Sequence, residues 1–157
     1  GVVAAMLASL CGLGMTVFNT VYDYKESVKK NEIDKDKYFD FLRRGGRLTP
    51  AAATIGSILK LKPIMTQTAD GMRLDKFAIK RTMKAAFATV IDHWKKKGLD
   101  ERHIIHVSHA RALSDAENAV RLLKEAFPNV EIQILDLGAA FVTQGGPQCV
   151  ALQYIEK

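Results

Sequence analysis

The fold is decided by HIIHVS at residues 103–108, SDAENAVRLLKEAF at 114–127 and VEIQILDL at 130–137. The outer segments are rich in β-branched and apolar residues, which is typical of strands. The middle segment opens with Ser114 and Glu117 at the spacing of a capping box, and its apolar residues recur at helical spacing. A strand, a capped helix and a second strand in close succession predict a βαβ unit with parallel strands and a right-handed crossover.

Further elements extend this unit in both directions along the chain. Apolar residues at helical spacing predict a helix over Thr82–Lys97, which Gly98 would end. Leu61–Thr68 and Met72–Ile79 are expected to be the strands of a hairpin, and Cys149–Ile155 a last strand. We therefore expect an α/β fold with α+β character, in which a mixed sheet is flanked by helices.

The N-terminal stretch Gly1–Tyr22 carries no charge and reaches the length of a membrane span. Its Ser, Thr, Asn and Gly residues dilute the apolar character, and no Lys or Arg precedes it. We therefore expect a buried helix over Ala4–Lys30, and neither a membrane span nor a signal peptide. Two shorter helices are expected over Asp34–Arg44 and Ala51–Lys60, the second with Thr49 as its N-cap.

Composition narrows the class of protein. A chain of 157 residues with 48% hydrophobic residues fits one domain with a buried core. The net charge of +6 permits an anionic ligand, but no stretch interleaves basic and aromatic residues, so a nucleic-acid partner is not expected. Two Cys form neither a disulfide framework nor a zinc site, which favours reduced cysteines in the cytoplasm.

Two glycine-containing loops are the candidate binding segments. In the first, Arg47 follows a Gly pair and precedes the expected N-cap Thr49, which suits a carboxylate or phosphate. In the second, Thr143 and Gln144 offer a hydroxyl and an amide between two strands. An inter-helix turn with solvated arginines and an ordinary loop are the plainer interpretations. The second loop has neither the Walker nor the dinucleotide-binding pattern.

The histidines give a weaker signal. His103, His106 and His109 lie on one expected strand, and we expect them to share a face. Because no acidic or Cys partner has the spacing of a metal ligand, we assign them structural or surface roles and expect no metal site. Asp136, at the end of a strand, is likewise assigned a structural role. No Ser-His-Asp or Cys-His arrangement is readable, so no catalytic residue is expected.

Several motifs resemble those of the DegV family. Residues 42–49, Leu-Arg-Arg-Gly-Gly-Arg-Leu-Thr, resemble its Leu-Lys-Lys-Gly-Gly-Arg-Ile-Ser signature. Ser9–Gly14 is similar to its Ser-x-x-Gly-Leu-Gly segment. Gly138–Cys149 is similar to its Gly-Pro-x-x-Gly-Thr-His-Thr-Gly-Pro-Gly-Ala stretch. The matches follow one another in the same order as in the family.

The resemblance implies a fatty-acid-binding protein of the bacterial cytoplasm that is not itself an enzyme. Residues 1–157 would be a single domain corresponding to the C-terminal lipid-binding region of a two-domain protein, whose N-terminal domain is absent from this sequence. The ligand would be a long-chain fatty acid, presented to a separate fatty-acid kinase for phospholipid synthesis, with no further cofactor. Arg47 and Thr143 would lie at the carboxyl head group. Gln144 stands where the family has a histidine, and glutamine cannot carry a proton at neutral pH.

An apolar tunnel would hold the acyl tail. We assign it contacts with Ile55, Leu59, Ile64, Met65 and Phe141. Burial of each CH₂ contributes about 0.8 kcal/mol, so the tail would set affinity and the head-group residues orientation. Two alternatives stay open on the residues alone. The chain could be a phosphate- or anion-binding α/β enzyme domain, or a protein-interaction module that docks through its uncharged N-terminal segment.

Overall fold

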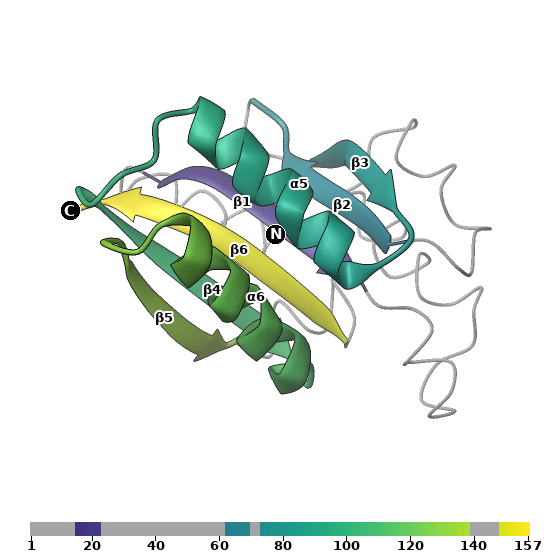
Figure 1. Ribbon diagram of the computed structural model, residues 1–157. Coiled ribbons are helices and arrows are strands. Elements are labelled where there is room, and N and C mark those ends of the chain that lie inside the picture. The colour runs from purple at the N-terminus through teal and green to yellow at the C-terminus, as the bar shows by residue number, and fades with distance from the viewer. Residues whose placement is uncertain (1–14, 23–61, 70–72, 139–147) are drawn as a thin grey trace, which may run out of the picture.

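The computed structural model describes residues 15–22, 62–69, 73–138 and 148–157. Within them, a six-stranded mixed sheet has the order β3-β2-β1-β6-β4-β5, and two helices lie on one of its faces (Figure 1). The sheet flanked by helices confirms the expected α/β class. The elements are β1 Met15–Tyr22, β2 Lys62–Gln67, β3 Leu74–Lys80, α5 Met83–Lys96, β4 His103–Ala110, α6 Leu113–Ala126, β5 Glu131–Asp136 and β6 Cys149–Glu156.

The helix expected over Ala4–Lys30 is wrong, because this stretch contains strand β1. The sequence MTVFNTVY of β1 is mostly β-branched and aromatic, which favours a strand. β1 lies in the interior of the sheet, where Val21 is paired with Ile64 on one side and with Val150 on the other. An interior strand has a neighbour on each side and sheet faces that can both be covered, so it has little need of charged residues. A buried helix also lacks charged residues, which is why the sequence pattern predicted a helix here.

The hairpin and the helix that follows it are confirmed. β2 and β3 pair antiparallel, with a register shift between Ile64 and Met65. α5 begins after Thr82, whose Oγ1 accepts a hydrogen bond of 3.1 Å from the backbone N–H of Ala85. Neither described helix has the length and apolar character needed to cross a membrane. The helices expected over 34–44 and 51–60 lie outside the described residues.

The βαβ unit is also confirmed, but its helix begins earlier than expected. β4 and β5 are parallel, and α6 connects them. Helix α6 starts at Leu113 after Ala112, which has no side-chain oxygen and makes no capping hydrogen bond. Ser114 therefore lies inside the first turn, and the predicted capping box does not form the start of the helix. β6 pairs antiparallel with both β4 and β1, which completes the mixed sheet.

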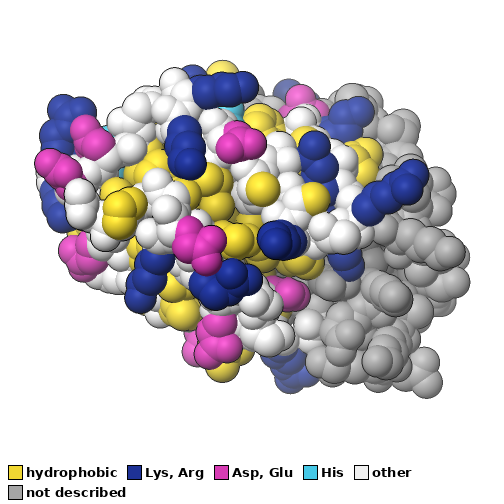
Figure 2. All heavy atoms as spheres, in the orientation of Figure 1, with side chains coloured by type: hydrophobic (Ala, Val, Ile, Leu, Met, Phe, Trp, Pro, Cys, Tyr) yellow, Lys and Arg dark blue, Asp and Glu magenta, His cyan; other side chains and the backbone are white. Residues whose placement is uncertain are grey.

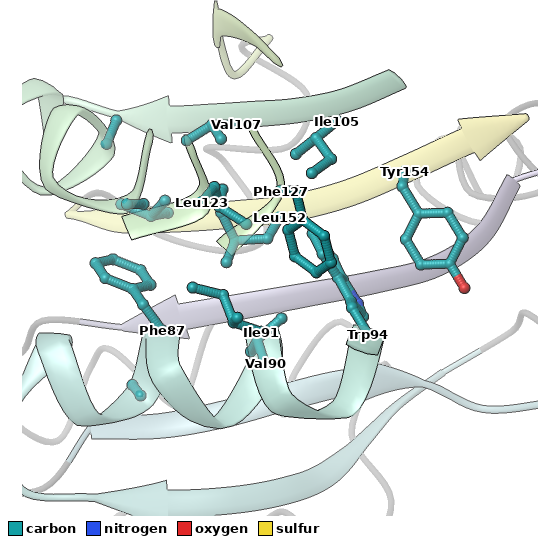
Figure 3. Packing of buried hydrophobic residues seen from close by; sticks show 14 of the residues in the cluster. Phe87, Val90, Ile91, Trp94, Ile105, Val107, Leu123, Phe127, Leu152 and Tyr154 are labelled. Atoms are coloured by element: carbon teal, nitrogen blue, oxygen red, sulfur yellow. The ribbon is translucent and has the colours of Figure 1, made fainter. Parts of the chain in front are cut away.

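One face of the sheet, called here the helix face, packs against α5 and α6. Large side chains from both helices and from β4 and β6 point toward one another there (Figure 3), and all of them are buried. The Trp94 ring meets the Tyr154 ring edge-on, with centroids 5.2 Å apart. The largest fully buried side chains of this face are Trp94, Phe87, Ile64, Ile105, Leu123, Leu152, Val90, Val107 and Val150.

The opposite face, called here the second face, has a different composition. Side chains alternate along a strand, so the residues between the core positions of β4 and β6 point away from the helices. Toward the end of β4 and the start of β6 these residues are short or polar: Ser108, Ala110, Cys149, Ala151 and Gln153. Ile104 and Ile155, at the other end of the two strands, share this face. The short or polar residues are all buried, although both described helices lie on the other side of the sheet. None belongs to the core cluster of the helix face.

Candidate functional site

The candidate site lies at one end of the sheet, called here the carboxyl end. The register places Tyr22 beside Cys149, and Cys149 beside Ala110. Lys62 pairs with Lys80 in the same part of the sheet. The carboxyl end therefore gathers the last residues of β1, β3, β4 and β5 and the first residues of β2 and β6. In open α/β sheets, this is the end at which ligands bind.

Both predicted binding segments join the sheet at this end. Residues 23–61 connect the end of β1 to the start of β2, and they include Arg47. Residues 139–147 connect the region after β5 to the region before β6, and they include Thr143 and Gln144. These three residues themselves lie outside the described part of the chain. The topology shows only that both segments begin and end at the carboxyl end of the sheet.

Both helices begin at the carboxyl end as well, because each follows a strand that ends there. The first N–H groups of a helix lack intrahelical acceptors, and the dipole makes this terminus positive. In α5, Thr82 supplies an acceptor for one of these groups. In α6, the N-cap residue Ala112 supplies no such acceptor, and Asp115 places a carboxylate in the first turn. The positive start of α6 is therefore already partly balanced by a carboxylate, whereas the first turn of α5 contains no acidic residue.

The charges near these strand ends are mostly positive. Among described residues within two positions of them, the basic side chains are those of Lys62, Lys80, Arg81 and Arg111, against one carboxylate, Asp136. Figure 2 shows Lys and Arg side chains on this side of the molecule, next to the residues drawn in grey. This balance favours an anionic group at the carboxyl end.

The end of β4 also anchors the second candidate loop on both sides. The carbonyl of His109 accepts a hydrogen bond of 2.9 Å from the N–H of Leu137, and the carbonyl of Ala110 accepts one of 2.7 Å from Gln148. Gln148 is buried and has a φ of 60°, and Arg111 has a φ of 54°. Such angles are uncommon outside glycine and concentrate at functional sites. Both residues with this conformation therefore mark the carboxyl end, within the described part of the chain.

His109 and Asp136 form a cross-strand pair at the same place. They are register partners on β4 and β5, and the distance from His109 Nε2 to Asp136 Oδ1 is 3.5 Å. The His109 side chain is 10% exposed, and that of Asp136 is 90% exposed. His109 Nδ1 is buried and has no hydrogen-bond partner among the described residues. A buried polar nitrogen without a partner is rare in folded proteins and needs an explanation.

The expectation that the three histidines share a face is wrong. Because neighbours alternate, a spacing of three residues puts His106 on the face opposite to His103 and His109. His106 lies 3.4 Å from the Gln153 amide on the second face. The His103 ring meets Tyr154 edge-on, and its Nδ1 lies 3.0 Å from Asp100 Oδ1.

The special position of His109 was missed at the sequence level, where it was grouped with its neighbours. Two features could have identified His109. It is an even number of residues away from the core residues Ile105 and Val107, so its side chain lies on their face of the strand. It also stands at the end of β4, next to β5, which ends in Asp136. Two parallel strands place such terminal residues side by side. Parity and strand ends together could therefore have predicted the pair.

Of the five predicted tail residues, two are described. Ile64 and Met65 are both fully buried. Ile64 belongs to the helix-face core. Met65 lies in register with Thr20, which is also the partner of Ala151, and so belongs to the second face. The other three predicted tail residues, Ile55, Leu59 and Phe141, lie outside the described residues.

The described residues offer little for nucleophilic or metal chemistry. Burial raises the pKa of the Cys149 thiol to about 12, so the thiolate that would act as a nucleophile does not form near neutral pH. Within the described ranges, no group of three His, Cys, Asp or Glu side chains is arranged to hold a metal ion. The features that remain are a buried face of short side chains and a positively charged end.

Comparisons with known proteins show which family this chain is similar to. The family described as "Uncharacterised protein, DegV family" matches residues 37–157. A DegV domain-containing protein of Halalkalibacterium halodurans is 33% identical over 88% of this chain and 50% of its own length. The chain thus spans about half the length of such relatives.

Solved structures show the same similarity. A structure described as fatty acid binding of a DegV family protein from Thermus thermophilus is 25% identical, with a TM-score of 0.67, over 98% of this chain and 50% of the other. DegV of Bacillus subtilis, described as a fatty acid binding protein, is 26% identical with a TM-score of 0.61, over 98% of this chain and 49% of its own. The sequence match and the shared fold agree: the chain belongs to the DegV family.

Proposed function

We propose that this chain binds a long-chain fatty acid, with the acyl tail against the second face and the carboxyl head at the carboxyl end. The observation that carries the proposal is the contrast between the two faces. The helix face is filled by large side chains, whereas the second face carries buried short ones at Ala110, Cys149 and Ala151. The two solved relatives described as fatty-acid-binding proteins support the choice of ligand.

The tail would supply most of the binding free energy. Each buried CH₂ contributes about 0.8 kcal/mol, so a sixteen-carbon chain contributes on the order of 10 kcal/mol before the entropy costs of association. Met65 is the described tail residue that suits this arrangement, since its flexible thioether adapts to an irregular guest. Ile64 faces the helices instead, so we assign it to the wall that supports the sheet. Ile55, Leu59 and Phe141 remain proposed tail contacts.

The head group would be held by residues attached to the carboxyl end. Arg47, Thr143 and Gln144 belong to the two segments that join the sheet there, and we propose them as the contacts of the carboxylate. The basic side chains near the strand ends add a favourable potential. A guanidinium binds a carboxylate through two parallel hydrogen bonds, which would fix its orientation.

The function would be that of a carrier and not of an enzyme. We propose that the chain forms the lipid-binding domain of a longer two-domain protein in the cytoplasm. The exposed head would be presented to a separate fatty-acid kinase, which would phosphorylate it for phospholipid synthesis. Gln144 cannot donate or accept a proton as a histidine would. Any proton transfer in that step would then come from another residue or from the kinase.

Native mass spectrometry tests the proposal on the polypeptide that carries this chain, purified from a bacterial host. We expect a bound mass that matches a long-chain fatty acid, and its loss on delipidation. Palmitate should then raise the thermal midpoint of the delipidated protein, whereas inorganic phosphate should not. Stabilisation by phosphate alone, with no bound lipid, would contradict the proposal and favour the alternative of an anion-binding enzyme domain.

A further inference from the structure

We infer that His109, held by Asp136, is a hydrogen-bonding residue for the acid head group of the lipid. This inference rests on the proposed function and adds to it a residue outside the two candidate loops. The pair lies at the carboxyl end, where Nε2 of His109 is 3.5 Å from Asp136 Oδ1. Nδ1 is buried and has no partner within the part of the chain that the structure describes. An acid head group would supply the partner that Nδ1 lacks.

The position of Asp136 determines which ring nitrogen is left for a ligand. An ionised carboxylate only accepts hydrogen bonds, so the Nε2 that faces it is best protonated. A neutral His109 then has a bare lone pair on Nδ1, which accepts a hydrogen bond, and a charged His109 has an Nδ1–H, which donates one. Because the ring is nine-tenths buried, its orientation is restricted by the surrounding packing. Asp136 is thus a positioning residue, and His109 is the contact.

A carboxylic acid matches both protonation states of the ring. A protonated acid donates its O–H to a neutral Nδ1, and a carboxylate accepts from the Nδ1–H of a charged ring. One proton lies between Nδ1 and the carboxyl oxygen in either case. A methyl ester has no such proton, so it cannot satisfy the neutral ring. The pair should therefore select free acids over esters of the same chain.

The start of α6 lies near the same position. By strand alternation His109 lies on the helix face, and α6 starts three residues after β4 ends. The helix dipole is positive at this end, and Asp115 in the first turn already balances part of it. The inference therefore rests on the His109 ring and not on the helix start. The charge of Asp136 balances that of a protonated ring.

The test compares affinities for palmitate and methyl palmitate in the delipidated polypeptide that carries this chain. We expect the wild type to prefer the acid, and His109→Leu to lose about tenfold in affinity for palmitate but little for the ester. His109→Asn, whose amide lies close to the place of Nδ1, should recover part of the preference. Asp136→Asn should lower it less than His109→Leu does.

His103→Leu is the matched control. His103 is on the same strand and face and also meets an aspartate, but it lies at the other end of β4 and its Nδ1 is engaged. This variant should leave the preference for the acid unchanged. Circular dichroism and the thermal midpoint establish that each variant folds. If His109→Leu does not fold, ¹⁵N NMR of the wild-type imidazole replaces it: the Nδ1 resonance should move with palmitate and not with the ester.

The outcomes separate the two ideas. If palmitate binds but His109→Leu keeps the full preference for the acid, the inference about His109 is wrong and the proposed function stands. An unmoved Nδ1 resonance at saturating palmitate has the same meaning. If neither lipid binds to the wild type, both the inference and the proposed function are overturned.

Discussion

The two faces of the sheet belong to the same strands but differ in the size of their buried side chains. On the helix face, β4 and β6 contribute Ile105, Val107 and Leu152, which interlock with Phe87 and Trp94 of α5. On the second face, Ser108, Ala110, Cys149 and Ala151 have short side chains, yet they are buried as well. Interiors pack at close to crystal density, so large side chains across the middle of one face leave no room there for an acyl tail. A sheet face that binds an acyl tail needs short side chains that are shielded from solvent.

The comparison teaches that burial alone does not identify a structural core. Leu152 and Ala151 are neighbours in β6, and both have zero exposed area. Their side chains nevertheless point to opposite faces and meet different surroundings. Substitutions at such adjacent pairs therefore separate the face that stabilises the fold from the face that we propose to bind lipid.

The largest effect is expected from Trp94→Ala on the helix face. Truncating this fully buried ring should lower the free energy of unfolding by about 3–5 kcal/mol, because it removes apolar contacts and leaves a cavity. Met65→Ala, on the second face, should cost less than half as much in the lipid-free protein. Urea denaturation of both variants gives the two values. Equal losses of unfolding free energy in the two variants would mean that the second face is packed as tightly as the helix face.

A smaller effect on stability, but a clear effect on binding, is expected from Ala151→Phe. The ring would occupy the proposed place of the tail and lower affinity for palmitate by at least tenfold, about 1.4 kcal/mol. Ala116→Phe is the control on the helix face, where overpacking should cost about 1–3 kcal/mol of stability instead. Isothermal titration and thermal unfolding measure both properties. The contrast between the two faces would be contradicted if Ala151→Phe lowered the free energy of unfolding as much as Ala116→Phe does.

The starts of the two helices that cover the helix face provide a third prediction. Thr82→Ala should cost about 1 kcal/mol, because it removes the capping hydrogen bond to Ala85. Ser114→Ala should cost nothing, since Ser114 lies inside the first turn and alanine is the better helix former. Chemical denaturation distinguishes the two. A comparable loss in Ser114→Ala would restore the capping box predicted from the sequence.

The smallest effect concerns the exposed Asp100, next to the His103 side chain on the helix face. A side-chain hydrogen bond from Arg102 lowers the pKa of Asp100 to about 2. A lowered pKa favours the folded state above the usual value of 3.8, and this contribution is lost as the pH falls from there through about 2. The urea midpoint should follow this course slightly, and Asp100→Asn should remove it. An Asp100 carboxyl that titrates near 3.8 by NMR would contradict the assignment.

The sequence predicted the segment from α5 to β5 well, because local signals govern it. Val90, Ile91 and Trp94 follow the helical period of α5, and β4, α6 and β5 follow in a short, regular crossover. β1 could not be predicted in this way, because what makes it a strand is its pairing with segments far along the chain. The start of α6 was missed because Ser114 and Glu117 match a capping pattern that the backbone does not use.

The head-group contacts Arg47 and Thr143 stay predictions, because both residues lie outside the described part of the chain. The topology shows only that the segments containing them begin and end at the carboxyl end of the sheet. That His109 would be left with a buried nitrogen without a partner could not be read from the sequence, because it depends on a cross-strand distance and on packing. Only a three-dimensional arrangement can show which of three similar histidines is left without a partner.

The place of β6 in the sheet also governs how the molecule is assembled. β6 is the last of the described elements in the chain, yet it lies between β1 and β4 near the middle of the sheet, where Val150 pairs with Val21. During synthesis, β1 and β4 leave the ribosome before the strand that joins them. Pairing between such distant segments is slow, and open strand edges invite aggregation. Nascent chains that stop before residue 149 should therefore depend on chaperones, since they have two halves of a sheet and nothing to connect them.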